Sequence, residues 1–235
     1  MGKHFFENLD EASIACARDI ITRAAQAVAE RGRFIWALAG GSTPAQLYNL
    51  LSLPPLTLEI DWGKTFFLWG DERCLPPDHR HSNYRMVKEA MLKHLPIEAE
   101  QIIAMNGQMV PQEGALLYEK NIRSLLESSP KNEARIDCIL LGMGQDGHTA
   151  SLFPGSKAIE EQKRWVVDVP PPEQAEPKVA RLTMTLPLIT EARSIFVLAG
   201  GSSKRAIIDQ LSSGPNDQYP ISNLADLAST TWYVY

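Results

Sequence analysis

Four short segments of the sequence combine glycine or acidic residues with other polar side chains, each directly after an apolar run. They are AGGSTP at 39–44, WGDERC at 69–74, GMGQDGH at 142–148 and AGGSSKR at 199–205. Such apolar runs predict buried strands, and open parallel sheets bind their ligands beyond the carboxyl ends of the strands. The four segments are therefore expected to meet at one site.

The first and last of these segments predict a phosphate site. In each, a predicted strand is followed by two glycines, hydroxyl residues and a helix, so that backbone N–H groups and the helix dipole favour an anion. Either turn alone could merely allow a tight connection, but two turns and a lysine favour phosphate. The candidate groups are Gly40, Gly41, Ser42, Thr43 and, in the first turn of the last helix, Lys204.

Two further charged groups have alternative interpretations. Arg181 alternates with Thr183 on a predicted strand, where it is either a solvated edge charge or a second clamp on the phosphate. Asp71 and Arg73 follow an apolar strand, which is typical of an ion-pair cluster, and both are also candidates for contact with substrate.

Cys74 has no visible partner for nucleophilic chemistry, so a small buried residue is favoured. The histidines of HRH, at 79–81, are expected to be exposed.

The segment GMGQDG fits the spacing G-x-G-x-x-G of a dinucleotide-binding turn, and Asp168 stands near the expected distance of about twenty residues. That fold needs a crossover helix, which Pro154 and Gly155 interrupt. Asp146 would also oppose a pyrophosphate. We therefore reject a dinucleotide turn. His148 instead becomes the best candidate for a general base, because imidazole titrates near neutrality and lies here beside an acid.

The composition excludes several classes of protein. The chain has 235 residues and a net charge of −5, which gives no reason to expect nucleic acid or an anionic membrane as partner. Three cysteines without C-x-x-C spacing indicate neither disulfides nor structural zinc. The start lacks the apolar core of a signal peptide, and no stretch has the length of a membrane span. We expect a cytoplasmic enzyme without metal that acts on a small molecule; its oligomeric state stays open, and a monomer is compatible with the sequence.

Helical and strand patterns alternate along the chain. Helices are predicted at 9–31, closed by Gly32, and at 82–95 and 112–128, and another starts with Thr43 as N-cap and Pro44 at its first position. The predicted strands are RFIWALAG, KTFFLWGDER, a short QIIAM, RIDCILLG, RWVVDV, KVARLTMTL, RSIFVLAGG and TTWYVY. This alternation predicts an α/β protein with a mostly parallel sheet covered on both faces. Residues 169–178 resemble a surface loop, so the chain is expected to form a single domain, 1–235.

The ordered motifs LAGGSTP, WGDERCLP, GMGQDGHTASLFPG, RLTMTLPLI and LAGGSSK resemble the 6-phosphogluconolactonase family, which is related to glucosamine-6-phosphate deaminases. The resemblance covers nearly the whole chain. It implies a Rossmann-like, doubly wound three-layer α/β/α fold without a redox cofactor. It also implies hydrolysis of 6-phospho-D-glucono-1,5-lactone to 6-phosphogluconate, a step of the pentose phosphate pathway.

The resemblance also implies roles for individual residues. His148 would activate water, and Arg73 would line the sugar pocket. The implied phosphate ligands are Ser42, Thr43, Arg181 and Lys204. In the resulting mechanism Asp146 orients the imidazole or the water, and Arg73 or backbone N–H groups stabilise the oxyanion.

Two other functions compete with this hypothesis. In the related deaminases a glutamate stands five residues after the histidine, and here that position holds Phe153. A sugar-phosphate-binding regulator would need only the phosphate ligands, whereas this chain also has Asp146 beside His148. The sequence departs from the family pattern at Gln145, where proline is common, and at its end, TTWYVY.

Overall fold

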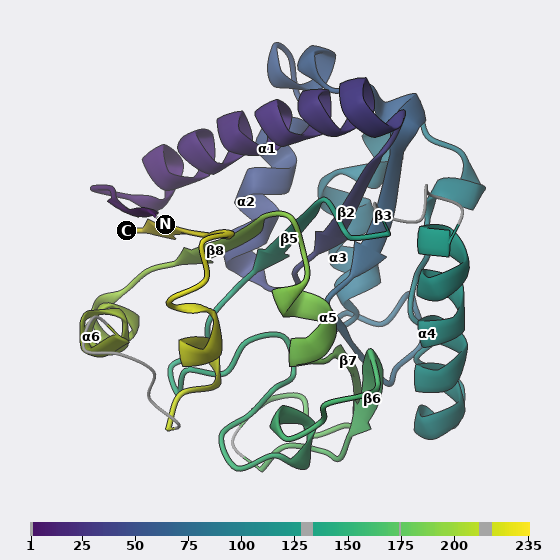
Figure 1. Cartoon of the computed structure of the whole chain (residues 1–235), viewed down its shortest axis with the longest axis vertical. Helices are drawn as coiled ribbons and strands as arrows, with labels where there is room; N and C mark the ends of the chain where they lie inside the picture. The colour runs from purple at the N-terminus through teal and green to yellow at the C-terminus, as the bar shows by residue number, and fades with distance from the viewer. Residues whose placement is uncertain (1, 128–133, 174, 212–217) are drawn as a thin grey trace.

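The computed structural model of the protein describes residues 2–127, 134–173, 175–211 and 218–235. Its central sheet has six parallel strands in the order β1-β9-β8-β5-β2-β3 (Figure 1). These strands are β1 (Gly2–Phe5), β2 (Phe34–Leu38), β3 (Thr65–Trp69), β5 (Cys138–Leu141), β8 (Ile195–Ala199) and β9 (Thr230–Val234). The prediction of an α/β fold with a mostly parallel sheet is confirmed.

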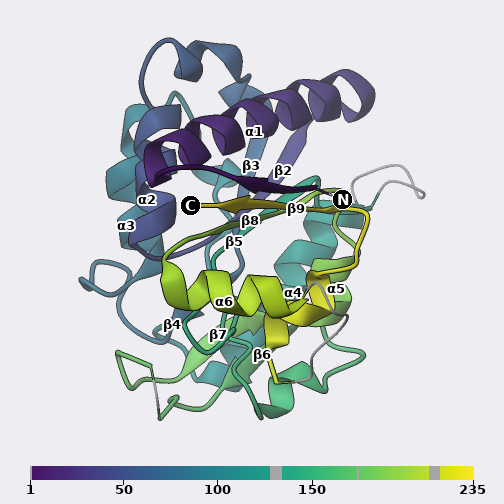
Figure 2. The same ribbon diagram turned by 90° about the vertical axis from the view of Figure 1, so that its left-hand side faces the viewer.

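Helices cover both faces of this sheet. Their bounds are α1 (Leu9–Arg31), α2 (Ser42–Leu51), α3 (Asn83–Ala90), α4 (Pro111–Glu127), α5 (Leu186–Thr190) and α6 (Ser202–Gln210). Side chains of a strand alternate between the two faces: in β2, Trp36 packs into the core under α1, α2 and α3, whereas Ile35 packs into the core with α4, α5 and α6. Figure 2 shows the sheet nearly edge-on, with α1 above it and α6 below. The arrangement is the predicted three-layer one.

The chain reverses its direction of winding between β2 and β5. From β2 it proceeds outward to β3, and from β5 it proceeds outward on the other side to β8 and β9. The connections that leave two such neighbouring strands run in opposite directions, and a crevice opens between them at the carboxyl ends of the strands. Doubly wound sheets bind their ligands in this crevice. The segments at this crevice are the ones that follow Leu38 and Leu141.

A second, smaller sheet was not predicted. It is antiparallel, with the order β4-β7-β6, and consists of β4 (Asp71–Arg73), β7 (Arg181–Met184) and β6 (Val166–Val169). It lies on the side of the central sheet that α4 and α6 cover (Figures 1 and 2). The predicted strand KTFFLWGDER thus divides at Gly70, whose N–H still bonds to Leu38 while the chain leaves the central sheet. In the small sheet Arg73 pairs with Arg181 and Asp71 with Thr183, and paired residues project to the same face.

Several predicted boundaries were wrong. The N-cap of α2 is Gly41 rather than Thr43, because the turn needs a φ of 99° that only glycine adopts freely. QIIAM, residues 101–105, forms no strand: its first residue ends a 3-10 turn at Ala99–Gln101, and Ile102 makes only an isolated bridge. The helix predicted at 82–95 ends at Ala90. By contrast, the helix predicted at 112–128 is confirmed over 112–127 and begins one residue earlier, at Pro111; residue 128 lies outside the described residues. Strand β1 was not predicted.

Other local predictions are confirmed. Helix α1 has its predicted bounds and ends at Gly32, which has a φ of 75° and donates its N–H to Val28. Of the predicted loop, residues 170–173 and 175–178 lie outside helices and strands, and residue 174 is not described. Among the helices that the structure describes, none has both the length and the apolar composition needed to cross a bilayer.

Candidate active site

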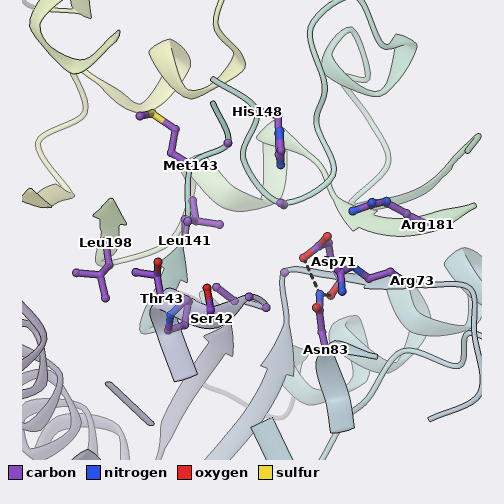
Figure 3. A pocket seen from close by; sticks show the side chains of 18 of the residues that line it. Ser42, Thr43, Asp71, Arg73, Asn83, Leu141, Met143, His148, Arg181 and Leu198 are labelled. Atoms are coloured by element: carbon purple, nitrogen blue, oxygen red, sulfur yellow. Dashed lines mark hydrogen bonds between the residues drawn. The ribbon is translucent and has the colours of Figure 1, made fainter. Parts of the chain in front are cut away.

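A pocket of about 230 Å³ opens at the carboxyl ends of β2 and β5, where the winding reverses. The predicted site residues that line it are Gly40, Gly41, Ser42, Thr43, Asp71, Arg73, His148, Arg181 and Lys204. Figure 3 shows Ser42 and Thr43 on one side, Asp71, Arg73 and Arg181 on another, and His148 facing the space between them. Of the predicted site residues, Asp146 alone does not line this pocket.

Asp146 instead holds the imidazole of His148. Its Oδ1 lies 2.6 Å from His148 Nδ1 and also accepts the His148 backbone N–H at 3.2 Å. Among the described residues no hydrogen-bond partner is found for Nε2, the other ring nitrogen. Partial burial raises the pKa of Asp146, but the hydrogen bond and charge of His148 outweigh it and hold that pKa below its usual value. An anionic Asp146 fixes the ring with Nδ1 protonated, which makes Nε2 the basic atom.

One glycine of GMGQDG, Gly144, makes room for this histidine. Residues 142–156 contain no helix, so the predicted interruption of the crossover helix at Pro154 and Gly155 is confirmed. A Cβ on Gly144 would lie 2.1 Å from His148 Nδ1, so only glycine lets the loop close over the ring. The closure is held by the Gly144 N–H, which donates to the His148 carbonyl at 2.8 Å.

The acidic residues after β3 are held by hydrogen bonds rather than by ion pairs. Asp71 is buried and accepts from Ser151 Oγ at 2.6 Å and from Asn83 Nδ2 at 3.1 Å. Glu72 accepts the backbone N–H groups of Asn83 and Tyr84, both at 2.8 Å, at the start of α3. Burial raises the pKa of Glu72, and these hydrogen bonds oppose that rise. The hypothesis of an ion-pair cluster is therefore wrong.

Asn83 is a pocket residue that the sequence analysis missed. Its side chain is 1% exposed, yet it lines the pocket and lies against Gly40, where a Cβ would come within 1.9 Å of its Oδ1. It thereby joins the first glycine turn to Asp71. The sequence signal that could have identified it is an asparagine in the first turn of a predicted helix, at the motif SNY.

The cations of the pocket lack acidic partners. Arg73 donates to the carbonyl of His81 at 2.6 Å, and Arg181 donates to the carbonyl of Glu176 at 3.3 Å. No carboxylate lies within 4 Å of either guanidinium among the residues described, and the Nε of each is buried without a partner. Arg181 is 3% exposed, so it is not the solvated edge charge that one interpretation offered.

Burial makes Arg181 and Lys204 weaker bases. It lowers the pKa of Arg181, which Asp71 partly offsets, and it lowers the pKa of Lys204. Burying a charge without a counter-ion is costly, and an anionic ligand relieves that cost. The pocket therefore favours an anion.

The two glycine turns contribute unequally. The turn before α2 lines the pocket with its backbone and with Ser42 and Thr43, whereas the turn before α6 contributes only Lys204. Gly201 nevertheless repeats the conformation of Gly41, with a φ of 94°. Of the two predicted turns, the first therefore lines the pocket with its backbone, and the second contributes the predicted lysine.

Phe153 packs beside both His148 and Arg181. Its ring centre lies 4.5 Å from that of the imidazole, and the Arg181 Cζ lies 5.3 Å from the same ring. The position that holds a glutamate in the related deaminases is thus filled by an apolar ring that is 8% exposed.

The neighbouring cysteine and histidines take no part in the pocket. Burial raises the pKa of Cys74 to about 11, so its sulfur is a thiol at neutral pH. His79 and His81 are partly buried rather than exposed, and the carbonyl of His81 holds Arg73. In the part of the chain that the structure describes, no three His, Cys, Asp or Glu residues form a group that could hold a metal ion.

Comparison with known proteins gives consistent matches over most of the chain. The model of the family described as glucosamine-6-phosphate isomerases/6-phosphogluconolactonase matches residues 7–232. A protein of Arabidopsis thaliana named probable 6-phosphogluconolactonase 1 is 36% identical over 209 residues, which cover 84% of this chain and 75% of that protein. The structure of 6-phosphogluconolactonase from Trypanosoma cruzi superposes with a TM-score of 0.87 at 30% identity, covering 99% of this chain and 93% of the other. A monomeric glucosamine-6-phosphate deaminase shares the fold, with a TM-score of 0.85 at 22% identity, covering 100% of this chain and 97% of the other.

Proposed function

The chain belongs to the family of glucosamine-6-phosphate isomerases and 6-phosphogluconolactonases, and within it we propose that the protein hydrolyses 6-phospho-D-glucono-1,5-lactone to 6-phospho-D-gluconate. This is a step of the oxidative pentose phosphate pathway. One observation carries the proposal: Asp146 holds His148 by Nδ1 at 2.6 Å, so that Nε2 remains available in a pocket whose cations have no acidic partner among the described residues. That pocket combines a base for water with a site for an anionic ester.

The chemistry is general-base hydrolysis. His148 Nε2 takes a proton from water as the water oxygen attacks C1 of the lactone. The carbonyl oxygen gains negative charge, which Arg73 or a backbone N–H group stabilises. When the bond from C1 to the ring oxygen breaks, the imidazolium gives its proton to that oxygen, and the new carboxyl group then ionises. Asp146 acts by orienting the ring, since its contact is with Nδ1.

The remaining polar groups bind the substrate. The proposed phosphate ligands are Ser42, Thr43, Arg181 and Lys204, with the backbone of Gly40 and Gly41. Charge-assisted hydrogen bonds from such groups are stronger than neutral ones. Asp71 faces the sugar hydroxyls, with its carboxylate already oriented by Asn83 and Ser151.

The deaminase and regulator alternatives have weaker support. Amino-sugar deamination begins with ring opening, and the glutamate position used by those relatives holds Phe153 in this chain. A regulator that only binds a sugar phosphate has no need of an acid that fixes the imidazole of His148.

We further propose that residues 1–235 act as one domain, because the pocket draws side chains from both sheets. We also propose a reducing compartment such as the cytoplasm. All three cysteines of the sequence are unpaired in the structure, as is usual in reducing compartments.

A coupled assay tests the function. Freshly generated 6-phosphogluconolactone is supplied to the protein, and formation of 6-phosphogluconate is compared with spontaneous hydrolysis. In parallel, glucosamine 6-phosphate is supplied and ammonia is measured. We expect hydrolysis well above the background and no ammonia. Ammonia release without lactone hydrolysis would show that the protein is a deaminase rather than a lactonase. Binding of 6-phosphogluconate without either activity would indicate a regulator.

A further inference from the structure

Tyr235 lies between the two glycine turns and contacts both. On the side of α6, its carbonyl accepts the Gly201 N–H at 3.1 Å, and its ring fills the space where a Gly200 side chain would be, since a Cβ there would lie 2.4 Å from the ring. On the side of α2, its hydroxyl lies 3.1 Å from Thr43 Oγ1. One side chain thus spans the gap between the turn that lines the pocket and the turn that supplies Lys204.

The chemistry of the ligand decides the direction of the hydroxyl contact. Either oxygen could donate in the free protein. A phosphate dianion has no proton to give, so Thr43 must donate to it, and the Thr43 oxygen is then left to accept. Tyr235 is the neighbour positioned to donate to that oxygen. Hydrogen bonds arranged head to tail in this way strengthen one another.

We propose that Tyr235 is a positioning residue of the phosphate site, acting through Thr43. Its hydroxyl orients the Thr43 proton toward the phosphate, and its ring sets the spacing of the Gly40–Gly41 and Gly200–Gly201 turns. The inference rests on the proposed function, because it takes a phosphate as the group that Thr43 meets.

The chain provides a matched control in Tyr233, two residues earlier on β9. Its hydroxyl is also hydrogen-bonded, but to the carboxylate of Asp19 on α1, and Tyr233 does not line the pocket. Tyr235 directly follows the end of β9, so Tyr233→Phe and Tyr235→Phe remove the same atom from neighbouring positions, and only the Tyr235 hydroxyl contacts a residue that lines the pocket, Thr43. Each substitution keeps the ring and its packing.

The test is calorimetric titration of inorganic phosphate into wild type, Tyr235→Phe, Tyr233→Phe, Thr43→Val and the Thr43→Val/Tyr235→Phe double variant. We expect Tyr235→Phe to weaken phosphate binding about 2- to 10-fold, as for one hydrogen bond. Tyr233→Phe should match wild type, and Tyr235→Phe should add no loss in the Thr43→Val background. In turnover of the phosphorylated lactone, KM should rise by the same factor while kcat stays unchanged.

Unaltered phosphate affinity of Tyr235→Phe would overturn the inference, as would an equal loss from Tyr233→Phe or an undiminished loss in the Thr43→Val background. Because affinity is measured without turnover, the proposed function can fail separately. A wild-type protein that binds phosphate but does not hydrolyse the lactone contradicts only the lactonase, and one that binds no phosphate contradicts both proposals.

Discussion

The acidic and the basic side chains of the pocket differ in how far the protein itself satisfies them. Asp71 accepts hydrogen bonds at both carboxylate oxygens, and Asp146 is bound to His148. Among the described residues, Arg73 and Arg181 donate hydrogen bonds only to backbone carbonyls, although Arg181 is buried. The protein thus fixes its carboxylates in place and leaves its cations for a ligand. An arrangement in which every charge was paired internally would be more stable but could not bind an anion.

The largest effect should come from removing the base that faces these cations. A positioned general base contributes about 10²–10⁴-fold to the rate, so His148→Asn should lower kcat by that factor above the spontaneous reaction. Affinity for 6-phosphogluconate and the melting temperature should change little, because the phosphate ligands are other residues.

His94→Asn is the matched control for this prediction, because His94 is exposed and lies outside the pocket. It should keep wild-type kcat. A folded His148→Asn protein that keeps more than about a tenth of wild-type kcat, well short of a general-base effect, would remove this histidine from the mechanism.

Removing an unpaired cation should have the next largest effect. Arg181→Ala and Lys204→Ala should each weaken binding of 6-phosphogluconate by about 1.5–3 kcal/mol, as for a charge-assisted hydrogen bond, or about 10- to 150-fold. Both variants should also lose much of the preference for the phosphorylated lactone over gluconolactone. Arg135→Ala and Lys120→Ala remove exposed cations and should bind product normally. Wild-type affinity in both pocket variants would place the phosphate elsewhere.

A smaller effect should appear on the alkaline side. Burial lowers the pKa of Lys204, and lysine binds phosphate only while it is protonated. Its contribution to affinity is therefore complete at neutral pH and is lost as the pH rises through a value below the usual one of about 10.4. Lys204→Arg keeps its charge, so its affinity for 6-phosphogluconate should stay constant over that range. An equal alkaline decline in the arginine variant would assign the titration to another group.

The smallest effect is expected from chelators and nucleotides. The described residues contain no group of three metal ligands. Residues 142–156 also lack the crossover helix that a dinucleotide-binding turn requires. Activity should survive exhaustive treatment with a chelator, and NAD or NADP should not raise the melting temperature. Loss of lactonase activity on chelation, restored by zinc, would refute a metal-free mechanism.

The sequence predicted the part of the site that follows from the parallel sheet. The apolar runs ending at Leu38, Leu141 and Ala199 are unambiguous strands, and the carboxyl ends of parallel strands share one edge. Their polar successors therefore had to lie near one another. The backbone conformation of each glycine turn is a local property and could be predicted. Which of the two turns lines the pocket depends on how the elements pack, and the sequence does not show that.

The small sheet and its consequences could not be predicted in this way. Pairing of Arg73 with Arg181 joins segments far apart in the sequence, and no local periodicity encodes that pairing. Asn83 became a pocket residue only because Asp71 and Gly40 close around it. Strand β1 was missed because an edge strand buries little: its Phe5 is 50% exposed.

A crystal structure with 6-phosphogluconate bound tests the central claim most directly, namely that the unpaired cations await a phosphate while His148 faces the reacting carbon. The account predicts the phosphate within hydrogen-bond distance of Lys204, Arg181 and Thr43. It also predicts the C1 carboxylate beside His148 Nε2. A phosphate beside His148, or product bound outside the pocket with Arg181 and Lys204 still unpaired, would contradict it.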